Sequence, residues 1–232
     1  MRRDALVGRR LHISALHSAV DAAFTGAGGV VLLAGEPGMG KTVLAAEAAD
    51  YAKTRGTTAL WGTCWAGEGA PGYWPWIQVV RALPGAEAVV GELTGGRDVV
   101  AGVLGDEAAA AFRAYDATAT FLRDRAARRP LVLVLDDLHW ADLSSLRLLS
   151  FLARYLRDSA ALVIGTYRDV EVMSGEHPAR PLFAELAGQA ESLQLTGLTS
   201  AEVAELLDGV CGERPPAALA AAVRERTGGN PF

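Results

Sequence analysis

The sequence has few of the features that mark several classes of protein. Its 232 residues include only two cysteines, Cys64 and Cys211, and these lie far apart. We therefore expect two small buried side chains in a reducing cytoplasm, rather than a disulfide or a metal site. No apolar run reaches the roughly eighteen residues of a transmembrane helix, and no signal-peptide apolar region follows the charged N-terminus. A net charge of −5 argues against a surface built for nucleic acid.

What the sequence does have is a glycine-rich loop between two apolar segments. The stretch 35–42, GEPGMGKT, fits the phosphate-binding pattern G-x-x-x-x-G-K-S/T at every fixed position. An apolar run, 30–34, enters the loop, and a helical pattern starting at Thr42 leaves it. Strand, glycine loop and helix is the order in which backbone N–H groups surround a phosphate. The alternative, a glycine-rich turn with an incidental lysine, is disfavoured because both flanks match.

Each fixed position of the loop has a predicted task. Gly38 and Gly40 let the backbone adopt conformations that a Cβ would obstruct. Lys41 is expected to reach the β- and γ-phosphates of a nucleotide, and the Thr42 hydroxyl is expected to bind Mg²⁺. The loop therefore predicts a nucleoside triphosphate as ligand.

Apolar runs alternate with helical patterns along the chain, which predicts an α/β fold with a parallel sheet and helices on both faces. The continuously apolar run 131–135 is typical of a central strand that is covered on both sides. A helix with Asp142 as its N-cap should follow, and it should bury Leu143, Leu146, Leu149, Ala153 and Leu156. Five strands are expected, at 30–34, 57–61, 131–135, 160–166 and an edge strand around 193–195.

Residues 62–107 are irregular, with a short helix expected at 77–83. Trp65, Tyr73, Trp74 and Trp76 are interpreted as the cover of an apolar edge of the sheet, with a contact surface for nucleotide or partner as the alternative. A helix over about 108–128 should end in a basic cluster. We interpret those arginines as a solvated helix end, at which cations favour the helix dipole.

The sequence changes in character after Gly197. Thr199 and Glu202 fit a capping box, and Leu198 with Val203 fits a hydrophobic staple. Helices to about residue 210 and over 216–226 should follow. We expect a nucleotide-binding domain at 1–197 and, at 198–232, the start of a small helical lid belonging to a longer protein.

Three predicted features should meet where the parallel strands end, because ligands of such sheets bind at the carboxyl ends of the strands. They are the glycine loop, the pair Asp136–Asp137 and Arg168. Hydrolysis of a nucleoside triphosphate needs a carboxylate for Mg²⁺, a group that activates water and positive charge at the γ-phosphate. Asp136, Asp137 and Arg168 are assigned these roles in that order. Alternatively, Asp137 caps a helix and Arg168 is a salt-bridge partner; His139 is interpreted as structural, with a water-mediated role left open.

These motifs resemble those of the signal-transduction ATPases with numerous domains (STAND), especially the ATPase module of large LuxR-type bacterial transcriptional regulators. Leu6–Arg9 resembles the family's VGR box, 131–142 its Walker B segment, Thr166–Arg168 its sensor strand and Gly229–Pro231 its G-x-P motif. The resemblance implies an AAA+-like sheet of five strands with a helical lid. It also implies that the VGR box lies beside adenine and ribose, that the sensor arginine meets the γ-phosphate and that the proline packs on adenine. Winged-helix, repeat-sensor and effector domains usually follow in this family.

The candidate site follows from the motifs and the resemblance together. The catalytic candidates are Lys41, Asp137 and Arg168, and the metal candidates are Thr42 and Asp136. ATP or ADP would bind with Mg²⁺ at these residues and at Val7, Gly8, Arg9, Glu36, Pro37, Gly38, Met39, Gly40, Lys41, Thr42, Val43 and Pro231.

Four functions are compatible with such a site. The first is a slowly hydrolysing regulatory switch that self-associates in its ATP state. The others are a motor-type ATPase acting on a macromolecule, a scaffold that holds ADP, and a small-molecule kinase. The kinase is disfavoured because the aspartate pair suits water activation. We expect a cytoplasmic protein whose partners, beyond nucleotide, do not include a membrane or nucleic acid bound directly by this segment.

Overall fold

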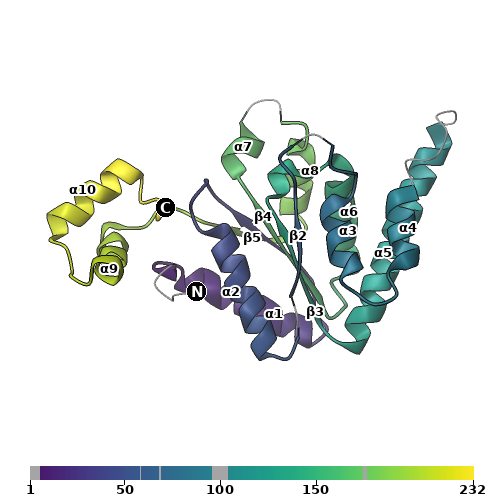
Figure 1. Cartoon of the computed structure of the whole chain (residues 1–232), viewed down its shortest axis with the longest axis horizontal. Coiled ribbons are helices and arrows are strands. Elements are labelled where there is room, and N and C mark those ends of the chain that lie inside the picture. Colours follow the sequence, from purple (N-terminus) through teal and green to yellow (C-terminus); the bar gives the residue numbers. More distant parts are fainter. Residues whose placement is uncertain (1–5, 58, 68, 96–103, 175–176) are drawn as a thin grey trace.

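The computed structural model describes residues 6–57, 59–67, 69–95, 104–174 and 177–232, with only the backbone described at 104–107. The structure is a sheet covered by helices on both faces, with two further helices set to one side (Figure 1). None of the helices in these ranges is long and apolar enough to cross a membrane.

The sheet has five strands, all parallel, as the sequence predicts. Its spatial order is β2-β3-β4-β1-β5, so β4 lies between β1 and β3. Every residue of β3 and β4 is buried, whereas β5 lies at an edge and is mostly exposed. The strands are β1 (Gly29–Ala34), β2 (Ala59–Thr63), β3 (Leu131–Asp136), β4 (Ala161–Tyr167) and β5 (Glu191–Gln194).

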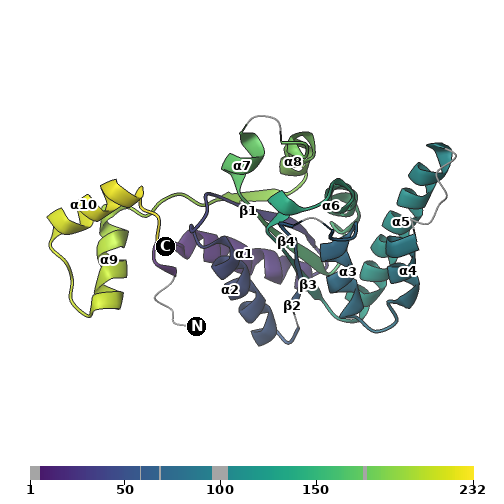
Figure 2. The same ribbon diagram turned by 45° about the horizontal axis from the view of Figure 1, so that its top comes forward.

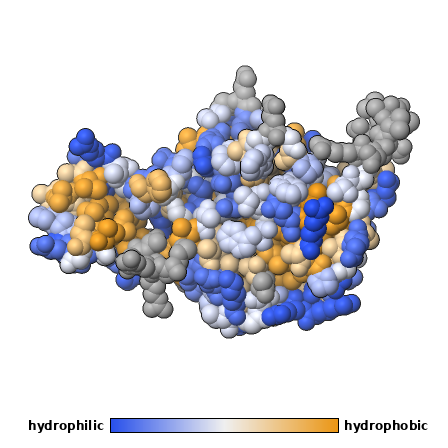
Figure 3. All heavy atoms as spheres, viewed as in Figure 1, coloured by the Kyte–Doolittle hydropathy of each residue, from blue (hydrophilic) through white to orange (hydrophobic). Residues whose placement is uncertain are grey.

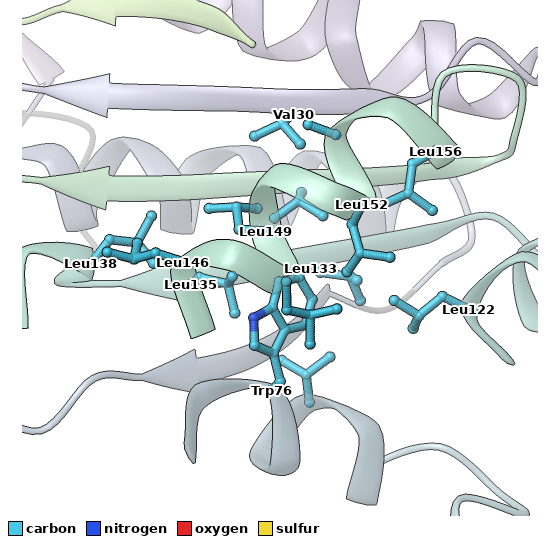
Figure 4. Packing of buried hydrophobic residues seen from close by; sticks show 14 of the residues in the cluster. Val30, Trp76, Leu122, Leu133, Leu135, Leu138, Leu146, Leu149, Leu152 and Leu156 are labelled. Carbon is cyan, nitrogen blue, oxygen red and sulfur yellow. The ribbon is translucent and has the colours of Figure 1, made fainter. Parts of the chain in front are cut away.

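Two apolar layers hold helices against the sheet. On one face α1 and α2 pack on side chains of β1, β3 and β4. On the other face the helices from α3 to α6, together with α8, enclose a layer that includes Trp76, Leu122, Leu133 and Leu149 (Figure 4). The helices are α1 (Arg10–Phe24), α2 (Lys41–Thr54), α3 (Trp74–Arg81), α4 (Glu87–Gly95), α5 (Leu104–Arg128), α6 (Leu143–Tyr155), α7 (Asp169–Met173), α8 (Arg180–Ala187), α9 (Ser200–Cys211) and α10 (Ala217–Thr227).

The tryptophan-rich segment only partly matches its interpretation. Trp76 is fully buried, and its indole N–H donates to the Ser145 carbonyl at 3.0 Å, so α3 does cover the edge strand β2. The approach is close enough that a Cβ at Gly62 would collide with the Pro75 backbone. Trp65 does not contribute to this cover, because 63% of its surface is exposed. Helix α3 also starts earlier than expected, since Pro75 fits the first turn of a helix.

Several expectations about single elements need correction. Leu143 is 37% exposed, because it lies in the first turn of α6, beside the cap Asp142 rather than over the core. Cys211 is exposed at the end of α9, whereas Cys64 is buried as expected. Strand β2 begins at Ala59, whereas the sequence predicts a start at Thr57. Thr57 instead donates its hydroxyl to the Pro130 carbonyl, and Thr58 lies outside the described residues.

Helices α9 and α10 form a pair beside the sheet (Figure 2). The expected capping box is confirmed, because Thr199 and Glu202 exchange side-chain and backbone hydrogen bonds. The pair has a small apolar cluster of its own, made by Leu198, Val203, Ala204 and Ala220. The segments before α9 and after α10 lie side by side, because the Leu198 N–H donates to the Gly229 carbonyl at 2.7 Å. We call these two segments, 196–198 and 228–231, the junction.

Candidate functional site

The glycine loop lies between β1 and α2, as its flanks predict. Gly38 and Gly40 have φ values of 81° and 90°, in the left-handed region that disfavours side chains. Lys41 opens α2 and is buried, and its ammonium donates to the carbonyls of Gly35 and Glu36, both at 2.8 Å. Burial, followed by the nearby positive charge of Arg168, lowers the pKa of Lys41. The carbonyls of the loop therefore surround the Lys41 ammonium, and the loop leads directly into the N-terminus of α2.

A hydrogen-bonded triad joins the loop to the neighbouring strands. The Thr42 hydroxyl donates to the Asp136 carboxylate, at 3.0 and 3.2 Å from its two oxygens. The Thr166 hydroxyl, at the end of β4, donates to the same carboxylate at 2.6 Å. Residues from α2, β3 and β4 thus meet at the carboxyl edge of the sheet. The sequence indicates Thr166 only as part of the sensor strand. Its contact with Asp136 could not be predicted, because it depends on β3 and β4 being neighbours in the sheet.

Asp137 is held in an unusual backbone conformation. Its φ is 59°, in the left-handed region where residues other than glycine are uncommon. Its N–H donates to the Thr166 hydroxyl at 2.9 Å, so one threonine holds both aspartates. Strained residues of this kind concentrate at functional sites. The Asp137 side chain makes no hydrogen bond that caps the turn that follows, so the helix-capping alternative does not apply, whereas the alternative of a loop carboxylate stays open.

Arg168 follows β4 and does pair with a carboxylate. Its Nη1 donates to Oε1 of Glu171 at 2.7 Å, and its guanidinium lies 5.0 Å from the centre of the Trp140 ring. The hydrogen bond from Arg168 is the main reason why the pKa of Glu171 is lowered. Glu171 lies on α7, a short helix that sequence reasoning missed. The neighbouring Asp169 instead accepts from Gln194 at 2.7 Å.

His139 is a deeply buried polar residue of the site. Its side chain is fully buried, and neither ring nitrogen has a hydrogen-bond partner among the described residues. Its Nδ1 lies 3.9 Å from Oδ1 of Asp137, and its Nε2 lies 3.7 Å from Oε2 of Glu171. Burial lowers the pKa of His139 to about 4, against the opposing effect of Glu171. The imidazole is therefore neutral at pH 7, between two carboxylates.

The residues expected on the adenine side gather where the two ends of the described chain meet the loop. Arg9 is buried and donates to the carbonyls of Thr196 and Met39, at 2.8 and 3.1 Å. Gly8 has a φ of 72°, and a Cβ there would lie 2.7 Å from the Glu202 carboxylate. The Asn230 amide donates to the Pro37 carbonyl at 2.8 Å. Val7, Val43 and Pro231 are half-buried.

This arrangement fits a nucleotide and its magnesium ion. Magnesium prefers oxygen ligands, and it is usually held by one or two carboxylates together with phosphates and water. Thr42 and Asp136 offer such oxygens within 3.2 Å of each other. No cluster of three or more acidic, histidine or cysteine residues that could hold a metal by itself occurs in the described part of the chain. The site therefore suits an ion that arrives with phosphate.

Comparison with solved structures supports the fold. A STAND protein with a tetratricopeptide-repeat sensor from Pyrococcus horikoshii has 17% identity and a TM-score of 0.58, covering 97% of this chain and 28% of its own. The ORC2 protein of Aeropyrum pernix, solved as ADPNP–ADP complexes, has 17% identity and a TM-score of 0.54, with 87% and 51% covered. The RuvB Holliday junction branch migration motor of Thermotoga maritima has 18% identity and a TM-score of 0.50, with 97% and 59% covered.

The chain thus spans only part of the length of each of these proteins, about a quarter for the STAND protein and about half for the others. No curated protein matches its sequence. A family model described as an AAA ATPase domain matches residues 5–164, more than half of the sequence. With this match and the five-stranded parallel sheet, the chain belongs to the AAA ATPase domain family.

Proposed function

We propose that this chain binds ATP with Mg²⁺ and hydrolyses it slowly, as a regulatory switch. The observation that carries the proposal is the hydrogen bond between Thr42 and Asp136, which joins the glycine loop to the end of β3. A hydroxyl and a carboxylate at this position are the two protein ligands that a phosphate-bound magnesium ion requires. Bound magnesium would neutralise charge that develops on the phosphates.

The chain's own residues divide the remaining work. Lys41 and the backbone N–H groups of the loop bind the β- and γ-phosphates. Asp137 accepts a hydrogen bond from the attacking water and orients it. Arg168 supplies positive charge to the terminal phosphate. Val7, Gly8, Arg9 and Pro231 shape the adenine side, together with the loop residues from Glu36 to Val43.

The switch itself lies in the helix pair. We assign 1–197 to the nucleotide-binding domain and 198–232 to the start of a lid. Two sets of hydrogen bonds support this, because they connect the lid's junction to the loop. Arg9 donates to both Thr196 and Met39, and Asn230 donates to Pro37. A change at the loop would therefore reach the lid directly. We further propose a cytoplasmic STAND module of a LuxR-type transcriptional regulator, with self-association in the ATP state.

The test is Lys41→Ala, measured by titration calorimetry with ATP. Losing the charge-assisted bonds to the phosphates should weaken binding about 10- to 100-fold. Lys53→Ala is the matched control, since Lys53 lies at the other end of α2 and pairs with Asp50 on the surface. Equal ATP affinity in Lys41→Ala and the parent protein would refute the site.

Turnover per subunit, followed against protein concentration, separates a switch from a motor. A switch should give slow turnover at all concentrations. Fast turnover that rises steeply with concentration would instead indicate an oligomeric motor.

A further inference from the structure

Glu171 faces two different partners with its two carboxylate oxygens. Oε1 accepts the 2.7 Å hydrogen bond from Arg168, while Oε2 lies 3.7 Å from Nε2 of His139, too far for a hydrogen bond. The side chains of Arg168 and Glu171 are 27% and 40% exposed, whereas that of His139 is fully buried. One carboxylate therefore lies between a partly exposed cation and a buried donor.

Among the described residues, no group forms a hydrogen bond with either ring nitrogen of the buried imidazole. A buried polar group without a partner is destabilising, and such a group in a native structure calls for an explanation. Two carboxylate oxygens lie within 4.0 Å of the ring nitrogens of His139, Oε2 of Glu171 and Oδ1 of Asp137. A shift of Glu171 by about 0.8 Å toward Nε2 would bring it to hydrogen-bonding distance. Such a shift would satisfy the imidazole, and the carboxylate is free to make it once Arg168 no longer holds Oε1.

The charges of Arg168 and Glu171 bear on which nucleotide binds. While Arg168 and Glu171 are paired, the guanidinium is largely neutralised, and a carboxylate lies near the site proposed for the terminal phosphate. Tyr167, which precedes Arg168, pairs with Ala34, which precedes the glycine loop, so the Arg168–Glu171 pair follows the strand end beside the loop. Glu171 therefore opposes the extra negative charge by which ATP differs from ADP.

We propose that Glu171 determines nucleotide specificity by competing with the terminal phosphate for Arg168, and that His139 receives the Glu171 carboxylate when Arg168 leaves it. The inference rests on the proposed function, since it requires the terminal phosphate beside Arg168. Glu171 and His139 are positioning residues, because they act through Arg168. The exchange needs no large motion, since His139 lies directly behind the carboxylate.

Removing the charge of Glu171 should change the ratio of ATP affinity to ADP affinity in the direction opposite to that expected if Glu171 had only a structural role. Glu171→Gln keeps the shape of the side chain and removes its charge. It should raise the ratio of ATP affinity to ADP affinity about two- to fivefold, the range expected for a partly exposed ion pair. If Glu171 merely held Arg168 in place, the ratio would fall. Glu185→Gln is the control and should leave the ratio unchanged, because Glu185 lies on α8 and pairs instead with Arg154 of α6.

His139→Phe tests the second half of the proposal, because phenylalanine fills the pocket but cannot donate to Glu171. It should lower the ATP/ADP affinity ratio in the parent protein. It should have no effect on that ratio in Glu171→Gln, which has no charged carboxylate to receive. Equal effects in both backgrounds would overturn the role of His139. If its melting temperature shows that His139→Phe does not fold, His139→Leu, which also cannot donate, should replace it.

Nucleotide affinities are best measured by displacement of a fluorescent ADP analogue, with melting temperatures alongside. An unchanged or lowered ratio in Glu171→Gln would overturn the role of Glu171. Lys41→Ala keeps this result separate from the proposed function. If Lys41→Ala loses ATP while Glu171→Gln leaves the ratio unchanged, only the competition is wrong; if Lys41→Ala binds ATP normally, the site itself is wrong.

Discussion

The sheet and the helix pair α9–α10 bury their side chains to very different extents. In β3 and β4 every residue is buried, and helices cover both faces. The apolar cluster of the pair has only four buried members, while Val210 and Leu219 are 73% and 52% exposed. Figure 3 shows the hydrophobic side chains that gather on the surface of the pair. Stability and the fixed geometry of the strand ends therefore reside in the sheet, whereas little apolar burial opposes movement of the pair.

The two regions also depend on different interactions at their contact. Inside the sheet, hydrophobic burial dominates, at about 25 cal/mol for each Å² removed from water. At the junction, Asn230 donates to Pro37 of the loop, and Arg9 bridges Met39 of the loop and Thr196, which lies just before the pair. A net hydrogen bond contributes only about 0.5–1.5 kcal/mol. Small changes in the loop can therefore alter the position of the pair without disturbing the sheet.

The largest effect is expected from truncation in the sheet. Leu133→Ala removes a fully buried side chain from the middle of β3, which should destabilise the protein by about 2–5 kcal/mol. Leu219→Ala is the matched change in α10 and should shift stability by at most about 0.5 kcal/mol. Urea denaturation followed by circular dichroism measures both. Similar losses in the two variants would mean that the pair is packed as firmly as the sheet.

The next effect concerns chemistry at the strand ends. Asp137→Asn should slow hydrolysis by about 10²-fold or more, because it removes the carboxylate that we propose orients the attacking water. ATP affinity should stay close to that of the parent, since Thr42 and Asp136 keep their contact. Asp136→Asn should impair both magnesium-dependent binding and turnover. If both variants lose binding equally in calorimetry, the two aspartates do not have separate roles.

Local signals predicted the sheet well. The five strands and most of the helices follow from periodicity, although α4 and α7 were not predicted. The capping box of α9 and the Asp142 cap follow from local sequence. The glycine loop is equally local. Its meeting with Asp136 was predictable because parallel strands end at one edge of the sheet.

Contacts between distant segments account for what the sequence did not reveal. Thr166 lies 30 residues from Asp136 in the chain, and Asn230 lies 193 residues from Pro37. The pairing of Arg168 with Glu171 depends on α7, a helix too short for a periodic pattern. The exposure of Cys211 and Leu143 likewise depends on which side of each helix has a neighbour. The unpredicted part of the site is thus the part that tertiary packing creates.

Acid should weaken the sheet region through His139. Its pKa is lowered to about 4 in the folded chain, whereas an unfolded histidine titrates near 6.5. The unfolded state therefore binds the proton more readily, and stability falls as pH decreases from about 6.5 towards 4. By pH 5 this histidine should contribute a loss of about 2 kcal/mol relative to neutral pH. Comparing urea midpoints of the parent and His139→Asn across this range measures the loss; parallel curves would contradict it.

The smallest effect on stability is expected from a change at the junction between the helix pair and the glycine loop. This change tests directly whether the pair is independent of the sheet. Asn230→Ala removes the donor to Pro37 and the acceptor of the Phe232 N–H, which lies 3.0 Å from the Asn230 side chain. The loss should be about 0.5–1.5 kcal/mol and should be confined to the junction. Hydrogen exchange should accelerate in peptides covering 36–40 and 228–232, while β3 and β4 keep their protection.

Thr199→Ala provides the comparison for this last variant. It removes the cap of α9, at a cost of about 1 kcal/mol, but leaves the Asn230–Pro37 hydrogen bond in place. It should therefore accelerate exchange in the first turn of α9 and leave the loop at 36–40 unchanged. If Asn230→Ala speeds exchange in β3 as much as at the junction, the pair is not an independent unit but an extension of the sheet's core. If it changes exchange at neither place, the contact with Pro37 does not hold the pair, and the path from the loop to the pair must run through Arg9.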